Sequence, residues 1–432
     1  MIPLLKELIV DSQVNPLFTG VARHLKVRSV AKKATVVIGV RRCGKSTFMN
    51  QITAELKSKG VSQENILHLN FFDDRLSTIK SVGLDLVLEA YYQIYPEKKN
   101  QEKIYCFFDE IQVIPGWESF IERTLRLENC EVYITGSSAD LLSKEIATQM
   151  RGRALTWELF PFLFKEYLTF FKIKTGKTFT SQERLKILKT FESYWIQGGF
   201  PEVFKQDNLL RIKIHQEYFN SILYRDLIER YDISHPKALK DLAIKLINNI
   251  SSLYTINSLT NYLQSLGHKV PKNSVSQYVA WFEDSFFLFT IRIFNASISK
   301  SNANPKKIYC IDHALVRSIS SGILLNSGHL LENLVFVELR SQYEEIYYYK
   351  TKRNQEVDFL VIKPNRDKML IQVCESLANI KTRQREISAL QNAMEELGLH
   401  KAILVTRSDQ EELKFEQGII EIIPVWSFLL QK

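Results

Sequence analysis

The residues with the clearest capacity for chemistry form a glycine-rich loop near the N-terminus. The chain reads Gly-Val-Arg-Arg-Cys-Gly-Lys-Ser over residues 39–46, which matches the pattern G-x-x-x-x-G-K-[ST]. An apolar run over residues 35–38 precedes the loop, and residues 47–56 carry apolar side chains at helix spacing. A strand, a tight turn and a helix N-terminus in this order aim backbone N–H groups at an anion. The pattern therefore predicts a loop that binds a triphosphate chain.

The side chains of this loop have separate expected tasks. We expect the Lys45 ammonium to reach the β- and γ-phosphates, and the Ser46 hydroxyl to ligate Mg²⁺. The backbone N–H groups of the loop are expected to bind further phosphate oxygens. The residues that we predict to bind nucleotide are Gly39, Arg41, Arg42, Cys43, Gly44, Lys45, Ser46 and Thr47.

An acidic pair forms the second motif. The apolar run over residues 104–108 predicts a strand, and it ends in Asp109 and Glu110. An acidic pair at a strand end is common by itself, but here a phosphate loop lies upstream. We assign Asp109 to the metal ion and Glu110 to the attacking water.

Three further residues are candidates for sensing or stabilising charge on the phosphates. A third apolar strand, over residues 130–135, runs into Ser137, whose hydroxyl could sense the γ-phosphate or cap the next helix. Arg151 and Arg153 follow that helix. Either one could act as an arginine finger, in its own subunit or a neighbour's, or the two could form a solvated basic turn.

Several blocks of the sequence resemble one known group of proteins. The loop, the acidic pair with residues 108–112, the Ile-Thr-Gly-Ser-Ser block at 134–138 and the Met-Arg-Gly-Arg block at 150–153 look like those of prokaryotic AAA-type ATPases. That family joins the ATPase to a C-terminal region long classed as a domain of unknown function. Later blocks extend the likeness over nearly the whole chain: Gly198–Pro201, Tyr224–Asp226 and Glu356–Phe359. The resemblance implies a protein that binds ATP with Mg²⁺ and hydrolyses it.

Length and composition limit the class of protein. A chain of 432 residues suggests two or three domains, and 24% charged residues are typical of a globular protein. No apolar stretch is long enough to span a bilayer, so we expect no membrane partner. Five scattered cysteines form no metal-binding pair, which favours a reducing cytoplasm. The net charge of +9 favours a polyanionic partner such as double-stranded DNA, although only modestly.

We expect an α/β protein with four parts. A P-loop ATPase domain with a parallel sheet is expected over 1–170, and a helical linker or lid over 171–235. A winged-helix domain over 236–322 is predicted because three helices precede a strand pair, residues 287–294 and 306–311. The order of elements over 323–432 resembles the restriction-endonuclease-like α/β fold.

The predicted winged helix offers candidate contacts to nucleic acid. The third helix carries polar side chains that could enter the major groove, and lysines of the wing could reach phosphates. A protein contact or a lid role is an equal alternative, because the helix lacks the arginine that most often reads bases. The candidates are Lys269 just before the helix, Lys272, Asn273, Ser276 and Gln277 on the helix, and Lys300, Lys306 and Lys307 on the wing.

The nuclease-like region keeps only part of the metal box that its resemblance implies. Glu332 and Asp358 could supply two of the acids, but Gln372 and Cys374 stand where a carboxylate and a lysine are needed. Glutamine binds divalent metal poorly, and cysteine cannot act as a fixed cation. We therefore expect nuclease activity to be absent and the fold to serve as a docking module.

Two functional hypotheses remain open from the sequence. In the first, the protein is an ATPase, alone or as a homo-oligomer, whose nucleotide state controls the C-terminal half acting on DNA. In the second, it is a slow, nucleotide-gated signalling or scaffold protein, whose C-terminal half binds a protein partner.

Overall fold

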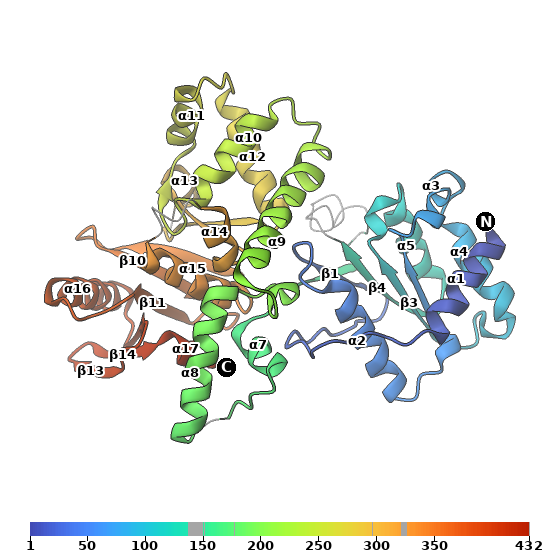
Figure 1. Cartoon of the computed structure of the whole chain (residues 1–432), viewed down its shortest axis with the longest axis horizontal. Helices are drawn as coiled ribbons and strands as arrows, with labels where there is room; N and C mark the ends of the chain where they lie inside the picture. The colour runs from blue at the N-terminus through green and yellow to red at the C-terminus, as the bar shows by residue number, and fades with distance from the viewer. Residues whose placement is uncertain (137–149, 151, 177, 296, 321–325, 432) are drawn as a thin grey trace. The chain divides into compact units, whose positions relative to one another are not determined.

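The computed structural model describes residues 1–136, 150, 152–176, 178–295, 297–320 and 326–431 (Figure 1). The chain divides into two compact units, Met1–Phe160 and Pro161–Lys432, which we call unit 1 and unit 2. In the described ranges, no helix combines the length and the apolar character needed to cross a membrane.

Unit 1 is built on a five-stranded parallel sheet in the order β2-β3-β4-β1-β5. Its strands are β1 (Ala34–Ile38), β2 (Ile66–Asn70), β3 (Ile104–Asp109), β4 (Cys130–Gly136) and β5 (Ala154–Glu158). The expected parallel sheet and α/β class are thus confirmed. Because β4 lies between β1 and β3, the carboxyl ends of these three strands meet at one edge of the sheet.

Helices cover both faces of this sheet. The helices of unit 1 are α1 (Ile2–Val14), α2 (Lys45–Ser58), α3 (Ile79–Val82), α4 (Asp85–Ile94) and α5 (Trp117–Leu127). The connection from β1 to β2 crosses the sheet in one direction, and that from β3 to β4 crosses back. Since such crossovers are right-handed, α2 and α5 lie on opposite faces, as Figure 1 shows.

Unit 2 begins with helices that lead into a large sheet. The helices are α7 (Phe164–Phe170), α8 (Ser181–Gln197), α9 (Asn208–Ser221), a π-helical stretch (Ile222–Ile228), α10 (Pro236–Ile247), α11 (Ile256–Ser265), α12 (Lys272–Asp284), α13 (Ile298–Ala303), α14 (His313–Ile319), α15 (Ser327–Arg340), α16 (Ile380–Leu397) and α17 (Val425–Phe428). The segment between the two strands predicted at 287–294 and 306–311 contains α13, so it is not a simple loop.

Nine strands of unit 2 form one mixed sheet in the order β13-β14-β12-β11-β10-β9-β7-β8-β6. They are β6 (Leu253–Tyr254), β7 (Leu288–Ile293), β8 (Lys306–Cys310), β9 (Glu345–Lys350), β10 (Glu356–Ile362), β11 (Lys368–Cys374), β12 (Lys401–Thr406), β13 (Glu411–Phe415) and β14 (Gly418–Pro424). The predicted hairpin is present as β7 and β8. It does not stand free, because β7 pairs with β9 in parallel.

The two faces of this sheet are buried by different helices. On one face, α16 packs its Ala389, Leu390 and Ala393 against Val357 and Leu360 of β10. On the other face, Phe336 of α15 stacks on Tyr309 of β8 with ring centroids 4.2 Å apart. The register of β10 shifts between Val357 and Leu360, and such a bulge re-aims the side chains between them.

A glycine pair joins α8 to α14 within unit 2. The backbone N–H of Gly199 donates to Asp312 Oδ2 at 2.7 Å. Asp312 is the N-cap of α14, and its Oδ1 accepts from the N–H groups of Ala314 and Leu315. Gly198 has φ of 75°, and a Cβ there would lie 2.4 Å from Asp312 Oδ1. The glycines at 198 and 199 therefore allow the buried Asp312 carboxylate to pack directly against the backbone.

Candidate nucleotide site

The phosphate loop follows β1, and its two glycines have separate structural reasons. Gly39 has φ of 154°, and a Cβ there would lie 2.2 Å from the carbonyl oxygen of Leu159. Gly44 caps the N-terminus of α2 with φ of 100°, in the left-handed region that favours glycine. The shape of the phosphate loop thus depends on Leu159, which follows β5, as well as on the sequence of the loop itself.

Lys45 links the loop to the acidic pair. Its side chain is buried, and its Nζ donates to the carbonyl oxygens of Gly39 at 3.1 Å and Val40 at 3.2 Å. The same Nζ lies 3.9 Å from Glu110 Oε1. Two motifs that are 65 positions apart in the chain (110 − 45) therefore meet at the carboxyl edge of the sheet.

Thr135 at the end of β4 organises both acids. Its hydroxyl donates to Asp109 Oδ1 and accepts from the backbone N–H of Glu110 at 3.1 Å. Glu110 itself has φ of 54°, which is strained for a residue other than glycine. Gln112 Nε2 donates to Glu110 Oε2 at 2.6 Å. These contacts hold the Glu110 carboxylate beside Lys45.

Arg23 supports the loop from the segment between α1 and β1. Its guanidinium donates through Nη1 to the carbonyl of Cys43 at 2.8 Å and through Nη2 to that of Phe160 at 2.5 Å. Its backbone N–H donates to Gln51 Oε1 of α2 at 3.1 Å. Arg23 is 7% exposed, so these bonds are shielded from water. It is a positioning residue that the sequence-based prediction missed.

The remaining predicted residues of the loop vary in exposure. Ser46 and Arg42 are exposed, and Thr47 and Arg41 are half-buried. Cys43 is buried, and this burial raises the pKa of its thiol. The Ser46 hydroxyl and the Asp109 carboxylate are oxygen donors of the kind that Mg²⁺ prefers, so the donor set fits this ion.

Of the serine and arginine candidates, Arg153 is the one that the structure describes. Ser137 and Arg151 lie outside the described residues. The carbonyl of Arg153 accepts from the N–H of Ala34, at the amino end of β1, whereas the phosphate loop follows the carboxyl end. The Arg153 guanidinium lies 3.3 Å from Glu122. The structure therefore does not bring Arg153 to the loop of its own chain.

The helix predicted to contact nucleic acid presents its polar candidates to solvent. Val275, Tyr278, Val279 and Phe282 of α12 are buried. The exposed candidates are Lys269, Lys272, Asn273, Ser276 and Gln277. The predicted wing differs. Lys306 is half-buried, nothing is described of the Lys300 side chain, and Lys307 is 2% exposed. The hypothesis that Lys307 reaches a phosphate is wrong, because its ammonium is buried among carboxylates.

Two of the predicted nuclease-like residues meet at that lysine. Lys307 Nζ contacts Glu332 Oε1 at 2.9 Å and Asp358 Oδ1 at 2.8 Å. Gln372 is close by, since its Oε1 accepts from the backbone N–H of Asp358 at 2.9 Å. Cys374 is half-buried, and its Sγ contacts the carbonyl of Ser376. Among the described residues, no group of three His, Cys, Asp or Glu side chains is arranged to hold a metal ion.

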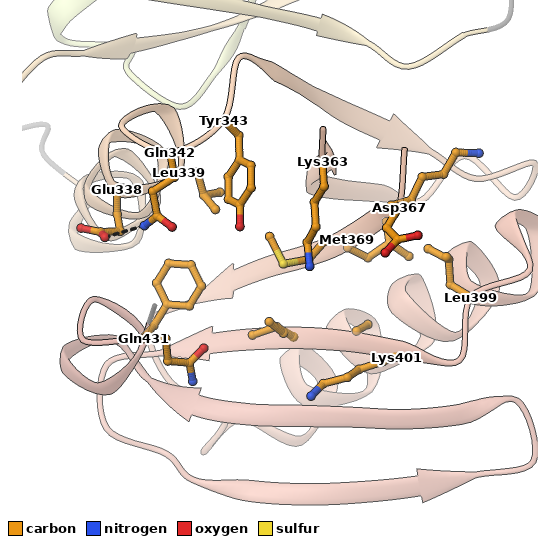
Figure 2. A pocket seen from close by; sticks show the side chains of 15 residues that line it. Glu338, Leu339, Gln342, Tyr343, Lys363, Asp367, Met369, Leu399, Lys401 and Gln431 are labelled. Atoms are coloured by element: carbon orange, nitrogen blue, oxygen red, sulfur yellow. Dashed lines mark hydrogen bonds between the residues drawn. The ribbon is translucent and has the colours of Figure 1, made fainter. Parts of the chain in front are cut away.

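A separate cavity of about 470 Å³ lies in unit 2 at the start of β11 and β12. Figure 2 shows Tyr343, Lys363 and Lys401 extending toward it. At one end, Gln342 donates to Glu338 Oε1 at 2.8 Å. Burial raises the pKa of Glu338 to about 7. Among the described residues that line this cavity, none was predicted from the sequence to bind a ligand or to act in catalysis.

The sheet order, the phosphate loop after β1 and the acidic pair at the end of β3 define a protein of the P-loop nucleotide-binding class. Residues 31–168 match the family model described as an AAA domain. Residues 188–324 match a Domain of unknown function (DUF8612), and residues 327–428 match a Domain of unknown function (DUF4143).

Two relatives align with nearly the whole chain. The Uncharacterized protein MJ1544 of Methanocaldococcus jannaschii is 34% identical over 439 residues, covering 99% of this chain and 95% of that protein. An uncharacterized protein of Haemophilus influenzae is 30% identical over 401 residues, covering 92% and 94%. The chain therefore belongs to the family that joins an AAA domain to these two domains of unknown function.

A solved structure gives a weaker likeness. The Aeropyrum pernix ORC1 protein in complex with DNA aligns over 75% of this chain and 92% of that chain, at 11% identity and a TM-score of 0.29. A score this low supports no inference about function.

Proposed function

We propose that this protein binds ATP with Mg²⁺ and hydrolyses it to ADP and phosphate. The observation that carries the proposal is the convergence of Lys45 and Glu110, whose Nζ and Oε1 atoms lie 3.9 Å apart. A buried cation of a phosphate loop beside a buried carboxylate is the pair needed to neutralise phosphate charge and to activate water.

Each residue has a stated part in the reaction. Lys45 exchanges its contacts with the Gly39 and Val40 carbonyls for phosphate oxygens. Ser46 and Asp109 hold the Mg²⁺, which when bound offsets charge on those oxygens. Glu110 orients the attacking water and accepts its proton. Thr135 fixes both acids through its hydroxyl.

The first test is nucleotide binding by the full chain. We expect Lys45→Ala to weaken ATP binding by about 100-fold in calorimetry, since a charge-assisted contact to phosphate is lost from a buried site. Lys57→Ala, near the other end of α2, is the matched control and should bind as the wild type does. Equal affinity in the two variants, or no binding of ATP by the wild type with Mg²⁺, would refute the proposal.

The place of action and the assembly are part of the proposal. All five cysteines are free, which fits a reducing cytoplasm. We further infer that Arg153 can act as an arginine finger only toward the loop of a neighbouring copy, because it pairs with Glu122 at the amino end of its own sheet.

Binding of double-stranded DNA through α12 is a second candidate function. It is favoured by the exposure of Lys272 and Gln277 on one side of α12, whose other side is buried, and of Lys269 just before this helix. Duplex binding should weaken steeply with salt, and the Lys269→Ala/Lys272→Ala double variant should lower the log–log slope by about two. If the duplex does not bind at low salt, the scaffold hypothesis with a protein partner is favoured instead.

A further inference from the structure

A buried lysine of unit 2 contacts three carboxylates, of which that of Glu356 is 31% exposed. Lys307 Nζ lies 2.9 Å from Glu332 Oε1, 2.8 Å from Asp358 Oδ1 and 2.8 Å from Glu356 Oε1. The Lys307 side chain is 3% exposed, and those of Glu332 and Asp358 are 8% and 9% exposed. An ammonium has three N–H groups, so each has a carboxylate partner here.

The carboxylates come from elements that are distant in the chain. Glu332 lies on α15, and Glu356 and Asp358 lie on β10. The cation comes from β8. In the nuclease-like fold that the sequence resembles, the positions of Glu332 and Asp358 would hold a divalent metal ion.

The residues present do not fit such an ion. The third metal ligand would come from the position of Gln372, but its Oε1 accepts from the Asp358 N–H and its Nε2 donates to Glu386 Oε2 at 2.7 Å. Asp358 Oδ2 accepts from the N–H of Val373 at 2.9 Å. Gln372 Oε1 and Asp358 Oδ2 therefore already accept hydrogen bonds. The Lys307 ammonium contacts the other two oxygens that a metal would use, Glu332 Oε1 and Asp358 Oδ1.

We propose that the Lys307 ammonium is the resident cation of this carboxylate cluster and takes the place that a divalent metal ion holds in the nuclease-like fold. A buried carboxylate cluster is unstable without a cation, because its charges repel and have lost their water. Lys307 supplies that cation from within the chain.

Packing in this cluster raises the pKa of both Lys307 and Glu332. Although burial opposes the charged form, the carboxylates of Asp358 and Glu332 raise the pKa of Lys307 well above its usual value. Burial and the negative charge of Asp358 raise the pKa of Glu332 to about 8.

The cluster also joins two family domains. Lys307 lies in the segment that matches DUF8612, and all three carboxylates lie in the segment that matches DUF4143. The second of these domains thus depends on a cation from the first. The nuclease-like module is then a metal-independent part of one folding unit.

The first test uses the full chain without nucleotide and titrates it with Mn²⁺, followed by electron paramagnetic resonance of the free ion. We expect wild type and Asp358→Asn to bind the same number of Mn²⁺ ions. We also expect the unfolding temperature of the wild type to be the same in EDTA and in Mn²⁺. A bound Mn²⁺ that is present in the wild type and lost in Asp358→Asn would overturn the proposal.

The second test removes the ammonium. Lys307→Met keeps much of the side-chain length without the charge, and Lys306→Met on the neighbouring half-buried residue is the matched control. In EDTA, Lys307→Met should unfold on the order of 10 °C below wild type, and Lys306→Met within about 2 °C of it. Added Mn²⁺ should restore at least half of the loss in Lys307→Met and bind at least ten times more tightly than to wild type.

Each result of the second test decides the matter. Equal stability of the two variants would show that Lys307 is not needed by the cluster. Loss of stability in Lys307→Met without gain of Mn²⁺ binding would show that the ammonium does not stand in a metal position. Either outcome overturns the proposal, and if Lys307→Met fails to fold, the wild-type titration still decides.

Discussion

Replacing Glu110 with glutamine should leave ATP bound and lower its rate of hydrolysis by about 100-fold or more. Glutamine keeps the size of the side chain and can still bond to Gln112, which donates to Glu110 Oε2 at 2.6 Å. It cannot accept the proton of an attacking water. Single-turnover hydrolysis together with calorimetric ATP binding measures both expectations on the same material.

The control for this variant is Glu118→Gln, a half-buried glutamate in the first turn of α5. It should hydrolyse ATP at the wild-type rate. Binding and hydrolysis falling together in Glu110→Gln would mean that Glu110 supports the loop through Lys45 and does not act on water. An unchanged rate would remove Glu110 from the reaction.

The parts of the nucleotide site that the sequence predicts are those written in contiguous residues. The phosphate loop and the acidic pair each occupy a few adjacent positions, because a turn between a strand and a helix is a local structure. Parallel strands then bring the two motifs to one edge, which the 3.9 Å separation of Lys45 and Glu110 reflects. The roles of Asp109, Glu110 and Ser46 in catalysis stay predictions.

The supporting residues could not be predicted in this way. Thr135 acts through its neighbours in the sheet, and that role follows only from the insertion of β4 between β1 and β3. Arg23 contacts Phe160, which is 137 positions away along the chain. No local period or spacing encodes a bond of that range, so the structure was needed to find it.

In unit 2 as well, local elements could be predicted from the sequence and long-range contacts could not. The hairpin of β7 and β8 was predicted from its pattern, but β6, β13 and β14 were not predicted. The parallel pairing of β7 with β9 was not predicted either, since strand partners that are far apart in the sequence leave no local pattern. The burial of Lys307 had a signal that was missed. In β8, alternate residues share a face, and Tyr309 is a core aromatic. Lys307 must therefore point toward the same interior.

The largest expected effect on stability concerns Asp312. Asp312→Ala should lower the free energy of unfolding by about 3–5 kcal/mol, because the buried N–H of Gly199 and two N–H groups at the start of α14 lose their acceptor. Urea unfolding followed by tryptophan fluorescence measures this, and Trp195 lies stacked on the adjacent His313. The matched control is Asp207→Ala, an exposed N-cap of α9, which should cost about 1 kcal/mol.

A double-mutant cycle tests whether the close approach of the Asp312 carboxylate is the reason for glycine at position 198. Gly198→Ala alone should also be strongly destabilising, since its Cβ would lie 2.4 Å from Asp312 Oδ1 at a φ of 75°. In Gly198→Ala/Asp312→Ala the clash with the carboxylate is gone, so the double variant should lose at least about 1 kcal/mol less than the two single losses added together. Strict additivity would show that glycine is needed at 198 for its backbone angle and for the space beside Ala314 Cβ, which would lie 2.8 Å from an added Cβ. In that case, the close approach of Asp312 would not be the reason that the chain has glycine there.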